Sequence, residues 1–116
     1  MIVTTTNEQY AQDLLTMING IFNLSGKEIE VLAIAITYNL EDPFSTEARK
    51  HITDRMEFKT VMEVNNYVRS LIKKGVMWRD EVKKIHVHGI IKEVFTKREF
   101  VVQFKFNTND SPVLQS

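Results

Sequence analysis

Apolar residues along the chain recur first with the spacing of helices and later with the spacing of strands. Three matches to the capping-box pattern, a Ser or Thr three residues before a Glu or Gln, mark helix starts at Thr6, Ser25 and Thr60. After each start, apolar side chains follow the period of about 3.6 residues that is typical of a helix with one buried face. Ser45, which follows Pro43, is a further start and predicts a short helix before the one that begins at Thr60.

The four predicted helices have defined ends and inward faces. The first spans residues 6–20, and the second ends at Pro43, because proline cannot continue a helix. The fourth ends where Gly75 suits the left-handed position that follows many helices. The side chains expected to point inward are Tyr10, Leu14, Met17, Ile18 and Ile21 in the first helix, Ile29, Leu32, Ala33 and Ile36 in the second, Ala48, Ile52 and Met56 in the third, and Val61, Val64, Val68, Leu71 and Ile72 in the fourth.

Beyond the fourth helix the period changes to the alternation of half-buried strands. Apolar and polar residues alternate over Phe100–Phe106 and over Ile85–Val87, so we expect these two segments to pair. The segment Gly89–Phe95 fits a helical turn as well as a further strand. Trp78 is expected to fill the junction between the fourth helix and the ribbon. The predicted fold class is therefore α+β: mostly helical, with a C-terminal ribbon of two or three strands.

Length and composition indicate one globular domain. The chain has 116 residues, 43% of them hydrophobic and 26% charged, so we expect a single domain over residues 1–106 and a flexible tail over residues 107–116. No apolar run approaches the ~18–20 residues that span a bilayer, and no leader pattern is present, which predicts a cytoplasmic protein, or a host-cytoplasmic or virion protein if it comes from a phage. The absence of cysteine excludes disulfides and thiolate chemistry.

Charge is distributed unevenly along the chain, although the formal net charge is zero. Residues 1–48 carry seven acidic side chains against one basic, whereas residues 49–106 carry fourteen basic against seven acidic. A basic second half is typical of proteins with an anionic partner. An acidic first half equally suits a protein partner or contacts between copies of the chain.

Two segments resemble winged helix-turn-helix regulators, a group that includes the MarR-like proteins. Phe22–Leu32 (FNLSGKEIEVL) looks like the opening of their first core helix. Val64–Met77 (VNNYVRSLIKKGVM) is similar to a recognition helix that runs into its Lys-Gly-apolar exit, and the chain from Arg79 onward would form the wing. The resemblance covers roughly residues 22–106, with the first helix as an addition, and implies a recognition helix that enters the DNA major groove.

The same resemblance implies which side chains contact DNA. Asn pairs with adenine, Arg pairs with guanine, and Lys neutralises phosphates. The expected DNA-binding residues are Lys59, Thr60, Asn65, Asn66, Arg69 and Lys73 on the recognition helix, and Lys83, Lys84, Lys97 and Arg98 on the wing.

Motifs for catalysis are missing, and two binding functions stay open. The sequence has no phosphate-binding Gly-rich loop, no His-Glu metal helix and no nucleophile elbow, so we expect neither an enzyme nor a cofactor. His86 and His88 share one face of a strand, but two imidazoles make only half a metal site. The first function is duplex-DNA binding by a small transcriptional or replication regulator, as a homo-oligomer. The alternative is an adaptor that uses the same fold for protein contacts, such as a phage ring or connector subunit.

Overall fold

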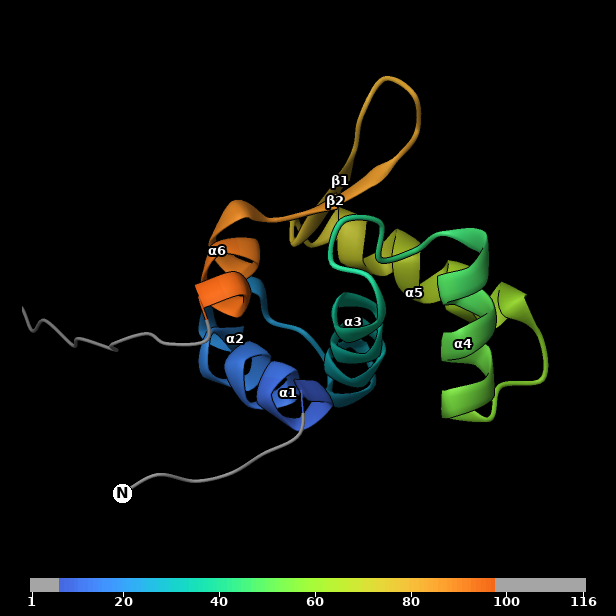
Figure 1. Ribbon diagram of the computed structural model, residues 1–116, viewed down its shortest axis with the longest axis horizontal. Helices are drawn as coiled ribbons and strands as arrows, with labels where there is room; N and C mark the ends of the chain where they lie inside the picture. The colour runs from blue at the N-terminus through green and yellow to red at the C-terminus, as the bar shows by residue number, and fades with distance from the viewer. Residues whose placement is uncertain (1–6, 98–116) are drawn as a thin grey trace, which may run out of the picture.

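The computed structural model describes residues 7–97, apart from the side chain of Lys97, and most of this length is helical. The helices gather around α3, and the two strands form a hairpin that projects from them (Figure 1). The predicted fold class is confirmed at this level: a mostly helical α+β arrangement with one small antiparallel sheet. The described elements are, in order, α1 (Asn7–Met17), α2 (Asn19–Phe22), α3 (Gly26–Tyr38), α4 (Thr46–Met56), α5 (Val61–Lys73), β1 (Met77–Arg79), β2 (Ile85–Val87) and α6 (Gly89–Lys97).

Two predicted helix starts are confirmed by their hydrogen bonds. The Ser25 hydroxyl accepts from the backbone N–H of Glu28, and the Glu28 carboxylate accepts from the backbone N–H of Ser25, which completes the capping box of α3. The Ser45 hydroxyl accepts from the backbone N–H of Ala48 and begins α4. The start predicted at Thr6 lies outside the described residues.

The capping box predicted at the start of α5 is wrong. The Thr60 side chain makes no capping hydrogen bond. The Glu63 carboxylate instead accepts from the backbone N–H of Lys59 at 2.8 Å, one residue earlier than the pattern requires. The helix nevertheless begins at the predicted place, because Glu63 still occupies the first turn and favours its positive end.

The N-terminal helix ends earlier than predicted. α1 stops at Met17, and the chain turns before a separate helical turn, α2, which continues past Gly20 to Phe22. The turn rotates the following residues out of the stripe that a single helix of residues 6–20 would have had. Ile21, which follows the turn, is therefore 67% exposed. Met17, in the last turn of α1, is 56% exposed as well, so the prediction that these two side chains point inward is wrong; the buried side chains of α1 are Ala11, Leu14 and Leu15.

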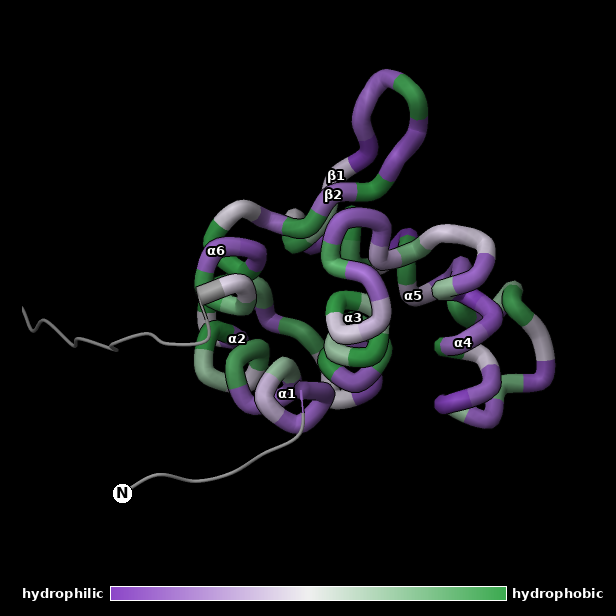
Figure 2. The backbone as a smooth tube through the Cα atoms, in the orientation of Figure 1, coloured by the Kyte–Doolittle hydropathy of each residue, from purple (hydrophilic) through white to green (hydrophobic). Residues whose placement is uncertain are grey.

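Hydropathy follows this arrangement. Figure 2 shows hydrophobic stretches through α3 and a largely hydrophilic α4 and hairpin. In α4 only Ala48 and Ile52 are fully buried, while Met56 is partly buried against the core as predicted. These two elements therefore contribute a polar surface on one part of the molecule.

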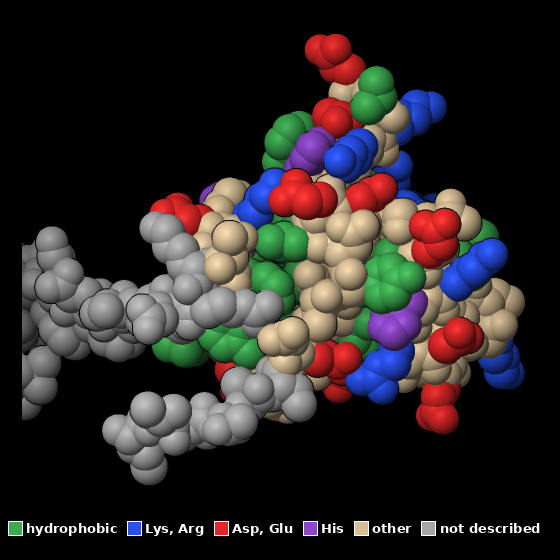
Figure 3. All heavy atoms as spheres, in the orientation of Figure 1, with side chains coloured by type: hydrophobic (Ala, Val, Ile, Leu, Met, Phe, Trp, Pro, Cys, Tyr) green, Lys and Arg blue, Asp and Glu red, His purple; other side chains and the backbone are tan. Residues whose placement is uncertain are grey.

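The hairpin differs from the predicted ribbon. β2 pairs with β1, so that Trp78 lies opposite His86, and the strand predicted at Phe100–Phe106 lies outside the described residues. The segment Gly89–Phe95 is helical and belongs to α6. Trp78 is 52% exposed, so its predicted burial is wrong: alternation turns Met77 inward and Trp78 outward. Figure 3 shows acidic, basic and histidine side chains along the projecting part.

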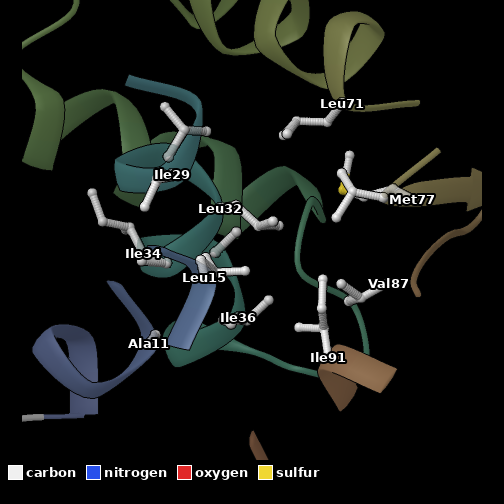
Figure 4. Packing of buried hydrophobic residues seen from close by; sticks show 14 of the residues in the cluster. Ala11, Leu15, Ile29, Leu32, Ile34, Ile36, Leu71, Met77, Val87 and Ile91 are labelled. Atoms are coloured by element: carbon white, nitrogen blue, oxygen red, sulfur yellow. The ribbon is translucent and has the colours of Figure 1, made fainter. Parts of the chain in front are cut away.

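The hydrophobic core is built around α3. Six consecutive residues of this helix, 31–36, are buried, because α1, α4, α5 and the base of the hairpin surround it. Figure 4 shows Leu32 and Ile36 of α3 directed toward Leu71 of α5, Met77 of β1 and Ile91 of α6. The core thus joins the helices to the hairpin, and it fixes the base of the hairpin relative to α5.

Candidate nucleic-acid interface

A cleft of about 670 Å³ lies between the start of α4, the start of α5 and the hairpin. It brings together three of the predicted DNA-binding residues, Asn65 from α5 and Lys83 and Lys84 from the hairpin. Its wall also holds two basic residues of α4 that were not predicted, Arg49 and Lys50. The remaining lining residues are Asp42, Phe44, Ser45, Thr46, Glu47, Val61, Val82 and Ile85.

Arg49 connects α4 to α5 inside this cleft. Its Nε donates to the backbone oxygen of Phe44 at 2.7 Å, and its Nη1 donates to Oδ1 of Asn65. Burial lowers the pKa of Arg49, and the positive charge of Arg79 lowers it further, while Asp42 opposes both. Arginine stays protonated at neutral pH despite such shifts, so Arg49 places a fixed positive charge in the cleft wall.

Asn65 is already engaged in this structure. A bidentate contact to adenine uses both the oxygen and the nitrogen of the Asn amide. Oδ1 of Asn65 accepts from Arg49, and Nδ2 lies 3.7 Å from the sulfur of Met62. Asn65 therefore links α4 and α5 in this structure. A base contact through both amide atoms requires that its hydrogen bond from Arg49 be broken.

The outward face of α5 carries an exposed stripe with helical spacing. Met62, Asn66, Arg69 and Lys73 follow one another at intervals of four, three and four residues and are all exposed. Arg69 donates from Nη2 to Oδ1 of Asn66, so these two polar side chains form one exposed pair. Three of the predicted recognition residues therefore share one face, beside the cleft that holds Asn65.

Lys59 and Thr60 lie at the start of α5 and are both exposed. The carboxylate of Glu63 lies beside them, because it accepts from the Lys59 backbone. A carboxylate at this helix start opposes a phosphate there. The structure thus places these two residues next to the exposed stripe but adds an acidic neighbour.

Asp80 organises the tip of the hairpin. Its Oδ1 accepts from the backbone N–H groups of Val82 and Lys84 at 3.0 and 2.9 Å, and its Oδ2 lies 2.7 Å from Nε2 of His86. The hydrogen bond to His86 has the largest effect and lowers the pKa of Asp80; desolvation opposes it, and the backbone bonds from Lys84 and Val82 lower the pKa further. These contacts position Lys83, which has a left-handed φ of 68°, and Lys84.

The other two predicted wing residues are Lys97 and Arg98. The side chain of Lys97 and the whole of Arg98 fall outside the described part of the chain. Asp80 and Glu81 form an acidic pair in the sequence. That pair does not indicate that the Asp80 side chain binds the turn backbone. The signal that could have indicated it is the spacing Asp80 to Lys84, which suits a turn held by an Asp side chain.

A second polar cluster anchors the far end of α5. Glu28, only 3% exposed, accepts from Nζ of Lys74 through Oε1 and from the hydroxyl of Ser70 through Oε2. Nζ of Lys74 also donates to the backbone oxygen of Asn23 at 3.1 Å. This cluster joins the start of α3 to the end of α5 and fixes the orientation of the exposed stripe relative to the core.

Burial alone would raise the pKa of Glu28, but the hydrogen bonds outweigh it. Those from Lys74, Ser25 and Ser70 lower the pKa from 4.5 to about 2. Glu28 is therefore charged at neutral pH, and its charge is compensated by Lys74. A charged and fully bonded carboxylate is a structural group here, not a proton donor.

Comparisons of the chain with models of known families, with curated proteins and with solved structures found no match. Among residues 7–97, no helix is both long and apolar enough to cross a membrane. The two histidines of interest have other contacts: His86 faces Asp80, and His88 packs against the ring of Phe22 with centroids 5.3 Å apart.

Proposed function

We propose that this protein binds duplex DNA through the cleft and the exposed stripe of α5. The observation that carries the proposal is the cleft itself, which gathers Arg49 and Lys50 of α4 with Lys83 and Lys84 of the hairpin. Four basic side chains from two elements face one concave surface, against the two acidic ones of Asp42 and Glu47. Such a surface suits a phosphate backbone.

The order of elements supports a winged-helix arrangement for this function. A core helix, α3, is followed by α4, by α5 and then by the hairpin, as the resemblance of the two sequence segments implies. In this arrangement α5 is the recognition helix and the hairpin is the wing. The exposed pair Asn66 and Arg69 then faces base edges, and Lys73 faces the backbone.

Fluorescence anisotropy with a labelled mixed-sequence duplex tests the proposal. Binding should weaken by orders of magnitude between roughly 50 and 200 mM salt, because it releases counterions from the phosphates. Lys83→Ala and Lys84→Ala should each weaken binding to every sequence and reduce the salt slope by about one. Lys27→Ala is the matched control, because Lys27 is an exposed lysine on α3 that pairs with Glu30 and does not line the cleft.

Failure to bind at the lower salt concentration would contradict duplex-DNA binding. The alternative, an adaptor that binds protein, is favoured by a separate observation: Met17 and Ile21 leave an exposed apolar surface on α1 and α2. This surface belongs to the acidic half of the chain. Sedimentation of the same preparation would then show whether a second copy covers it.

A further inference from the structure

We propose that the outer face of the hairpin binds an unpaired nucleobase, so that the preferred ligand is a junction between duplex and single-stranded DNA. The proposal rests on the proposed duplex binding and adds a second contact with different chemistry. It starts from Trp78, which is the one tryptophan of the chain and lies 52% exposed on β1.

The Trp78 ring is held in a fixed orientation. It stacks on the ring of its cross-strand partner His86, with centroids 4.4 Å apart and planes 22° from parallel. His86 is held in turn by Asp80, whose other oxygen binds the turn backbone. An aromatic ring that is ordered before binding loses little conformational freedom when a base stacks on it, and every base has a face that can stack.

Space for a planar ligand adjoins the ring. Trp78 lines one hollow of about 500 Å³ at the edge of the hairpin, together with Arg79, Asp80, Glu81 and Val82. It lines another of about 180 Å³ with His86 and Lys92. Of the acidic groups beside the ring, Glu41 is paired with Lys92 at 3.0 Å and Asp80 is engaged by His86. Glu81, which lines the first hollow, is exposed and forms no ion pair within the described part of the chain. The second hollow, whose carboxylate is paired with Lys92, therefore suits a nucleotide better than the first.

The hairpin has two faces with two different chemistries. Its tip residues Lys83 and Lys84 line the basic cleft, whereas Trp78 and His86 lie on the opposite side of the sheet from the buried Met77, Ile85 and Val87. Arg79 connects the two faces: it lines a hollow with Trp78, and its charge acts on Arg49 in the cleft wall. A duplex in the cleft and a base on Trp78 would thus meet across a cation that suits the phosphate between them.

A similar stack elsewhere in the chain provides a control. Tyr38 of α3 is half exposed and stacks on His51 of α4, with centroids 4.5 Å apart and planes 25° from parallel. Neither residue lines the basic cleft. The proposal therefore rests on the position of Trp78 on the hairpin that borders the cleft, and not on an exposed aromatic–histidine stack alone.

The test compares a short blunt duplex with the same duplex carrying a short single-stranded overhang on either strand, measured by anisotropy at low salt and by Trp78 emission. An overhang should tighten binding by about fivefold or more, which is the gain expected from stacking one base on an aromatic side chain. The overhang should also quench Trp78 emission more than the blunt duplex does. Trp78→Leu should abolish the preference for the overhang and keep blunt-duplex affinity within about twofold. Trp78→Phe should keep part of that preference, and the control Tyr38→Leu should keep all of it.

The outcomes separate this inference from the proposed function. Equal affinity for blunt and overhang ligands, with equal emission, overturns the nucleobase site and leaves duplex binding standing. A preference that survives in folded Trp78→Leu also overturns it, because the overhang then binds elsewhere. Absence of binding to the blunt duplex contradicts the proposed function itself, and the junction with it.

Discussion

Glu28 shows how one buried charge can stabilise a fold. A buried carboxylate is costly unless opposite charge and hydrogen bonds compensate it. Here Lys74, Ser70 and the backbone of Ser25 provide that compensation, so removing the charge leaves Lys74 without its charged partner. The carboxylate also completes the cap of α3, which gives it a local role and a long-range role.

We expect Glu28→Gln to lower the free energy of unfolding by roughly 1–3 kcal/mol at neutral pH, as measured by urea denaturation followed by circular dichroism. The pKa of Glu28 is about 2 in the fold and 4.5 when unperturbed, so its charge stabilises the fold above about pH 4.5. That contribution, on the order of 3 kcal/mol at most, decreases as pH falls from about 4.5 toward 2. The difference between wild type and Glu28→Gln should shrink over the same pH range.

Glu30→Gln is the matched control for this prediction. Glu30 lies on the same helix, but its contact is an exposed pair with Lys27 at 3.6 Å, and such pairs contribute little. It should change the free energy of unfolding by less than about 0.5 kcal/mol. Equal effects of the two substitutions would contradict the role given to the buried cluster.

At the scale of single residues, local partners were predictable and distant ones were not. The spacing of Ser25 and Glu28 indicates a capping box, because both groups belong to one helical turn. Lys74 and Ser70 reach Glu28 from 46 and 42 residues away, and no spacing indicates such a contact. In the same way, Arg49 and Lys50 line the cleft because α4 packs against α5, and no spacing in the sequence indicates that packing.

At the scale of elements, helices were predictable where strong end signals stood at both ends. α5 begins and ends close to the predicted places. α3 begins at the predicted cap of Ser25, but it ends at Tyr38, five residues before Pro43, where its end was predicted. β1 was missed because Val76, Met77 and Trp78 are consecutive apolar residues and show no alternation, so β2 was assigned another partner. The hairpin, which is central to the candidate site, was therefore only half predictable.

Two glycines should respond in opposite ways to the same substitution. Gly75 has a φ of +84°, so Gly75→Ala should destabilise the protein by about 1 kcal/mol or more, although nothing lies within 4 Å of the added Cβ. Gly20 lies inside α2 without such a φ and with equal space, so Gly20→Ala should stabilise by about 0.5–1 kcal/mol. Thermal denaturation of both variants measures the signs; a stabilising Gly75→Ala would contradict the conformational argument.

At the scale of the whole molecule, one core holds the helices and the base of the hairpin together. Val76, Met77 and Val87 belong to the same buried cluster as α3. The hairpin therefore cannot detach from the helices without exposing apolar surface to water. We expect the described part of the chain to unfold as a single unit.

Leu32→Ala tests this unity. Leu32 is fully buried at the centre of α3, so the substitution should cost about 2–5 kcal/mol. Circular dichroism reports the helices and Trp78 emission reports the hairpin, and both should shift to the same lower urea midpoint. Ile21→Ala removes a similar side chain that is 67% exposed and should shift neither. Two separate transitions would show that hairpin and helices are independent.

The contact between α1 and α6 affects the order in which the chain can fold. The Tyr10 hydroxyl donates to the backbone oxygen of Val94 at 3.3 Å, and the Tyr10 and Phe95 rings lie 5.8 Å apart, although α1 and α6 stand at opposite ends of the described chain. During synthesis α1 emerges before the other described elements and can pack on α3 early, but its contacts with α6 form only after the hairpin has been made. Among the described elements, the packing of α6 against α1 is therefore the contact that forms last, and it closes a loop of chain that contains α3, α4, α5 and the hairpin.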